Sequence, residues 1–79
     1  MIEWETSGLL DQGHVTEAIE ISKLTVTLYP NSSKAYADLG DAYRRGGNHS
    51  LAIESFARAV ALNRKNYYAQ EQLRKLQHQ

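Results

Sequence analysis

The chain has 79 residues, which is enough for one domain with one small hydrophobic core. Nine basic side chains balance nine acidic ones, so the formal net charge is zero and no basic field favours nucleic acid or an anionic membrane as a partner. No cysteine is present, which excludes disulfides, thiolate metal sites and cysteine nucleophiles.

Neither a targeting segment nor a membrane span is predicted. The first ten residues lack a basic stretch followed by an apolar one, and no apolar run nears the roughly 20 residues that a membrane span needs. The chain is therefore expected to be soluble. Its compartment stays open, with the cytoplasm slightly favoured.

In chain order, the first clear helical pattern covers residues 15–29. Its apolar residues recur at helical spacing, from Val15 through Ala18 and Ile19 to Leu28. Several β-branched residues in its second half lower the intrinsic helical preference. Packing against a neighbour is therefore expected to support this helix.

A second helix is predicted over residues 33–45. Tyr36, Leu39 and Tyr43 are spaced by three and then four residues, which places them on one face. Polar residues after Pro30 can cap its start, and two glycines follow its last residue. Both ends are therefore well marked.

Two more helices are predicted, over residues 50–63 and 67–77. Asn48 is a suitable cap for the earlier one, and Phe56 is the largest member of its apolar stripe. The later one has few apolar residues among Gln, Glu, Lys and Arg, as is typical of a helix with one buried and one wet side. The short connections predict antiparallel neighbours.

An internal repeat decides the architecture. Four pairs of identical residues are each separated by 34 positions: Gly13 and Gly47, Ala18 and Ala52, Ile19 and Ile53, Leu28 and Leu62. A 34-residue period with two helices per unit resembles the tetratricopeptide repeat. The resemblance is most specific in residues 33–66, where the positions of that family's pattern hold Tyr36, Leu39, Gly40, Tyr43, Gly47, Ala52, Phe56 and Ala59.

This resemblance implies an all-α fold, an antiparallel helix-turn-helix array of about two repeats followed by a C-terminal capping helix. Residues 1–79 would form a single domain. Within it, residues 1–30 are a degenerate first repeat, residues 31–66 the second repeat and residues 67–79 the capping helix.

The first repeat departs from the family pattern. Thr6 replaces a small glycine and Ser22 a large aromatic residue, while Trp4 lies off the expected packing stripe. About three stacked repeats are normally needed to bury a continuous core. We therefore expect Trp4, Leu9 and Leu10 to pack on another copy of the chain or on a neighbouring domain.

A second, narrower resemblance concerns residues 28–32, Leu-Tyr-Pro-Asn-Ser, and the Ala-Tyr, Leu-Gly and Ala-Tyr pairs that follow. It is similar to the helical tail found after the catalytic domain of some bacterial serine hydrolases and β-lactamase-like proteins. This resemblance implies an appendage that stabilises or dimerises its enzyme and carries none of the hydrolase chemistry.

The sequence does not favour a catalytic site. His14, His49 and His78 have no metal-ligand spacing, and no serine lies in a Gly-x-Ser-x-Gly setting. The Gly-Gly pair at 46–47 is not followed by lysine and indicates a turn, not a phosphate-binding loop. We expect no enzyme activity, no metal and no cofactor.

A peptide-binding surface remains. Such repeats hold a peptide on the concave side lined by their first helices. Carried onto this chain, the family's groove positions give as candidates Lys34, Asp38, Asp41, Arg44, Arg45, Tyr68 and Lys75. Asp41 stands where binders of a terminal carboxylate have asparagine, which excludes that mode.

Equally, the acidic and basic groove residues of the second helix can be ion pairs within that helix. The sequence thus predicts a non-catalytic scaffold that binds a peptide or protein surface. The alternatives are the hydrolase appendage and a unit for homo-oligomerisation, with a homodimer as its simplest form.

Overall fold

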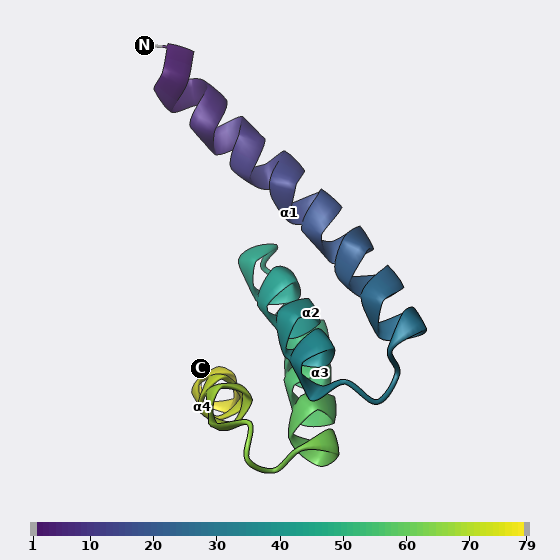
Figure 1. The fold of residues 1–79 in the computed structure, drawn as a ribbon. Helices are drawn as coiled ribbons and strands as arrows, with labels where there is room; N and C mark the ends of the chain where they lie inside the picture. The colour runs from purple at the N-terminus through teal and green to yellow at the C-terminus, as the bar shows by residue number, and fades with distance from the viewer. Residues whose placement is uncertain (1, 79) are drawn as a thin grey trace.

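The computed structural model describes residues 2–78, and the side chains of residues 14–78. It contains α1 (Ile2–Leu28), α2 (Ser33–Arg45), α3 (His49–Leu62) and α4 (Tyr67–Gln77). Each helix packs on the next one along the chain (Figure 1). The expected all-α array of antiparallel helices is confirmed.

Local capping sets where the last three helices begin. Ser32, Asn48 and Asn66 each accept a hydrogen bond from the backbone N–H three residues later, at 3.1, 3.2 and 3.1 Å respectively. Between α2 and α3, Gly47 adopts a φ of 82°, which glycine tolerates without steric cost. The predicted bounds of α2 and α4 are confirmed, and α3 begins and ends one residue earlier than predicted.

Helix α1 differs from the prediction. A separate helix beginning at Val15 is wrong, because α1 is continuous from Ile2 to Leu28. The stretch contains no proline, and each of its two glycines, Gly8 and Gly13, costs only about 1 kcal/mol relative to alanine inside a helix. Residues 12–14 are Gln-Gly-His, so they lack the second glycine and the asparagine cap of the Gly-Gly-Asn at residues 46–48.

The core lies between α2, α3 and α4. Phe56 is fully buried and is surrounded by the cluster of buried residues Ala37, Ala52, Ala59, Ala69 and Leu76. The small alanine side chains let the three helix backbones approach the Phe56 ring closely. This core fixes the spacing of α2 and α4, which carry most of the candidate site residues.

Candidate functional site

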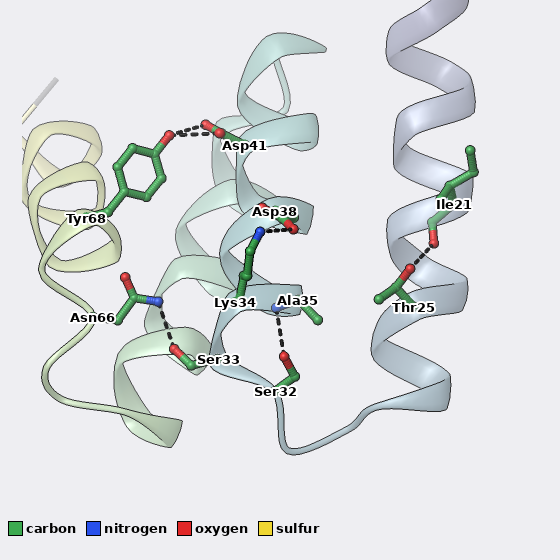
Figure 2. Close-up of polar contacts among 10 residues, drawn as sticks. All are labelled: Ile21, Thr25, Ser32, Ser33, Lys34, Ala35, Asp38, Asp41, Asn66 and Tyr68. Atoms are coloured by element: carbon green, nitrogen blue, oxygen red, sulfur yellow. Dashed lines mark hydrogen bonds and ion pairs between the residues drawn. The ribbon is translucent and has the colours of Figure 1, made fainter.

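Three polar side chains join α2 to α4. The Tyr68 hydroxyl donates to the Asp41 carboxylate, with 2.7 Å to each carboxylate oxygen, and Arg44 Nη2 donates to Asp41 Oδ1 at 3.0 Å. Figure 2 shows the Tyr68 ring reaching from α4 to Asp41 on α2. We call Asp41, Arg44 and Tyr68 the Asp41 cluster. It cross-links the two helices that the peptide-groove hypothesis needs side by side.

A second polar link lies at the other end of α2. Asn66 Nδ2 donates to Ser33 Oγ at 2.8 Å (Figure 2). Ser33 Oγ in turn donates to the Ala59 carbonyl of α3 at 2.7 Å. Because Asn66 is also the N-cap of α4, the start of that helix is tied to both helices of the preceding pair. Together with the Asp41 cluster, this link holds α4 to α2 at two points.

Residues 33–66 match the family model of the tetratricopeptide repeat. The chain carries a tetratricopeptide repeat. The matched residues are α2, α3 and the turn that leads into α4. Tetratricopeptide repeats generally act as interaction scaffolds and not as enzymes, so the match supports a role in protein–protein interaction. No curated protein matches the chain, and the similarity to hydrolase tails stays a prediction.

The repeat's core positions the cluster. The Tyr68 ring packs edge-on against Phe56, with ring centroids 6.2 Å apart and an angle of 71° between the ring planes. Burial of the phenol raises the pKa of Tyr68 above its usual 10.0, and the hydrogen bond to Asp41 raises it further. The hydrogen bond to Asp41 also raises the pKa of Arg44. Asp41 therefore stays engaged with its two neighbours at neutral pH.

This geometry predicts an alkaline loss of stability that depends on Tyr68. A raised pKa in the folded state gives stability that is complete below pH 10 and is lost as the pH rises through the folded pKa. Urea unfolding of the wild type should therefore show a lower free energy at pH 11 than at pH 8. We expect Tyr68→Phe to reduce this difference, whereas Tyr67→Phe, at a ring that is 69% exposed, should leave it unchanged. An equal alkaline loss in Tyr68→Phe and the wild type would contradict the assignment.

The remaining groove candidates lie on exposed parts of α2 and α4. Lys34 Nζ pairs with Asp38 Oδ2 at 3.3 Å, and Lys75 Nζ lies 3.8 Å from Glu71 Oε2. The ion-pair interpretation thus fits Asp41 with Arg44, whereas Asp38 pairs with Lys34 instead of an arginine. Such exposed pairs contribute at most about 1 kcal/mol, so their charges remain open to a ligand.

The structure also contains a groove that the sequence did not indicate. It lies between α1 and α2 and is lined by Ala18, Ile21, Ser22, Asp38, Asp41, Ala42 and Arg45. We call it the α1/α2 groove. A second hollow of similar volume adjoins it, lined by His14, Val15, Ala18 and Arg45. Three of the candidates for peptide binding, Asp38, Asp41 and Arg45, therefore also line the α1/α2 groove. The 34-residue offset was the one sequence signal that could have located this groove.

Trp4, Leu9 and Leu10 belong to the stretch of α1 whose side chains lie outside the described residues. Across residues 14–78, no three His, Asp or Glu side chains gather as metal ligands, and His14, His49 and His78 are exposed. In the described part of the chain, no helix combines the length and the apolar character that crossing a membrane requires.

Proposed function

We propose that the chain is a non-catalytic scaffold that binds a peptide or protein surface along α2 and α4. The tetratricopeptide repeat at residues 33–66 supports an interaction role. The observation that carries the proposal is the hydrogen bond from Tyr68 to Asp41, which cross-links the first helix of the repeat to α4. A surface held in place before binding loses less conformational entropy when a ligand binds.

The charges of this surface define the ligand that it would accept. Asp41 is already engaged by Arg44 and Tyr68, so it offers little free charge to a ligand. Lys34 and Lys75 extend from α2 and α4 with side chains that are 85% and 60% exposed, each beside a carboxylate. Charges of both signs favour a peptide that carries both acidic and basic side chains. A bare terminal carboxylate is disfavoured, because Arg44 already pairs with Asp41.

A peptide selected from a library tests the location of the site. Random 12-residue peptides displayed on phage would be selected against the full chain, and the dissociation constant of one selected peptide measured by fluorescence polarisation. We expect the double variant Lys34→Glu, Lys75→Glu to weaken binding by about tenfold or more, which is about 1.4 kcal/mol. The reason is that both substitutions reverse the charge of the proposed surface.

The matched control is Arg64→Glu with Lys65→Glu, which makes the same change in net charge on exposed residues of the turn between α3 and α4. Its affinity for the peptide should stay within about twofold of the wild type. Equal weakening in the two double variants would show only an effect of net charge. Unchanged affinity in both would place the peptide on another surface and overturn the proposal.

A further inference from the structure

By the 34-residue offset, the second half of α1 corresponds to α3. One face of α3 is buried, and the equivalent face of α1 is not. The residues of α3 that are buried are Ala52, Ser55, Phe56 and Ala59. The residues 34 positions earlier are Ala18, Ile21, Ser22 and Thr25. None of these four is buried, and Ile21 is 63% exposed where its counterpart Ser55 is 6% exposed. The equivalent face of α1 is therefore only partly covered.

The repeat indicates what should cover this face. In residues 33–66, α2 lies against the buried face of α3, so close that a Cβ on Gly40 would stand 2.9 Å from the Phe56 ring. The residues 34 positions before residues 36–45 of α2 are residues 2–11. By this correspondence, a helix with the sequence of residues 2–11 belongs in the α1/α2 groove, over Ala18 and Ile21.

Residues 2–11 of the same chain do not reach this groove. They continue α1 in a straight line, and at 1.5 Å per residue they extend roughly 18 Å beyond His14. Figure 1 shows this end of α1 running past the end of α2. An opened turn that leaves an element unable to pack on its own chain is the arrangement from which identical chains exchange that element.

We propose that the α1/α2 groove binds residues 2–11 of a second copy of this chain, and that the exchange is reciprocal. In the repeat, residue 40 of α2 packs on residue 56 of α3, and the residues 34 positions earlier are 6 and 22. Residue 6 of one copy should therefore pack on residue 22 of the other. Two straight α1 helices related by a twofold axis would then run antiparallel and cross at residue 14, midway between residues 6 and 22. Gly13, beside the crossing point, lets two helix backbones approach closely.

The exchange also accounts for apolar groups in this region. Ile21 lines the groove with a mostly exposed side chain, and Leu9 of the donated segment is the counterpart of Tyr43, which packs against the core of the repeat. Exchange supplies the missing first helix of each degenerate repeat and extends both stacks. The groove shares Asp38, Asp41 and Arg45 with the peptide-binding candidates, whereas Lys34 and Lys75, which test peptide binding, do not line it. The two proposals can therefore be tested independently.

Disulfide trapping tests the contact directly, because the chain has no cysteine of its own. In the full chain carrying Thr6→Cys with Ser22→Cys, mild oxidation should give a covalent dimer on a non-reducing gel. Thr6→Cys with Thr27→Cys is the control, since the counterpart of Thr27 is the exposed Ala61 of α3, and it should not cross-link. A disulfide within one chain, or none at all, would overturn the exchange.

The solution mass supplies an independent readout. Sedimentation of the wild type from about 1 µM to 1 mM should reveal a species of two 8.9 kDa chains. Gln12→Gly with His14→Asn recreates the Gly-Gly-Asn of residues 46–48, so its α1 should turn back and give a monomer. Ile21→Glu should also give a monomer, whereas Thr27→Glu should remain dimeric.

Each of these outcomes bears on the exchange alone. A wild type that is monomeric throughout, or a dimer that survives both the Gly-Gly-Asn variant and Ile21→Glu, would overturn it. Peptide affinity measured on the monomeric Gly-Gly-Asn variant separates the two proposals, because the surface of α2 and α4 is unaltered there. Loss of dimerisation with retained peptide binding is the expected result.

Discussion

Replacing Phe56 by alanine should cost about 3–5 kcal/mol of folding free energy, the range for truncation of a fully buried aromatic residue. The ring fills the space among the alanines of α2, α3 and α4, which are too small to close the cavity that it would leave. A domain of this size has about 3–5 kcal/mol of stability from its core. The alanine variant should therefore be largely unfolded at 25 °C, with loss of helical circular dichroism.

A graded series keeps this prediction interpretable. Phe56→Leu retains most of the apolar volume and should remain folded with a lowered midpoint of urea unfolding. Tyr67→Ala removes an aromatic ring that is 69% exposed and should change the free energy of unfolding by no more than about 0.5 kcal/mol. A stable Phe56→Ala, or a loss as large in Tyr67→Ala, would mean that the core lies elsewhere.

The bounds of the last three helices were predictable because their signals are local. Ser32, Asn48 and Asn66 each cap a helix within their own four-residue window, and Gly47 permits the turn before α3. The 34-residue period also predicted that α2 packs on α3, a contact that no local sequence signal predicts. Sequence therefore predicted the helices of residues 33–77 and the order in which they pack.

Helix α1 was not predictable in the same way. The repeat pattern placed a turn at Gly13 by analogy with Gly47, but a single glycine is compatible with both a turn and a continuous helix. The difference between the two outcomes depends on what residues 2–11 pack against. Those contacts lie between helices or between chains, and local helix propensity does not predict them.

The candidate site was predicted as a set of positions, without its contacts. The sequence placed Asp41 and Tyr68 on the same surface, yet the hydrogen bond between them joins residues 27 positions apart. The link from Asn66 to Ser33 was likewise not anticipated, because it joins residues 33 positions apart. Contacts between helices depend on the packing distance that Phe56 and its alanine neighbours set.

That packing distance makes Gly40 the second most sensitive position. A Cβ there would stand 2.9 Å from Cδ2 and Cε2 of the Phe56 ring, and the ring is fully buried and has no space to move into. We expect Gly40→Val to cost about 3 kcal/mol, at the upper end for an overpacked core, and Gly40→Ala to cost about 1 kcal/mol or more. Helix propensity alone predicts the opposite sign for alanine, a gain of about 1 kcal/mol.

A double-mutant cycle identifies the cause of this loss. If the clash with the Phe56 ring is responsible, Gly40→Ala should cost less in a Phe56→Leu background than in the wild type, because the smaller side chain leaves room for the added methyl group. The free energies come from urea unfolding of the four proteins. Additive effects, or a higher stability of Gly40→Ala alone, would show that the close approach of α2 to α3 does not depend on glycine at this position.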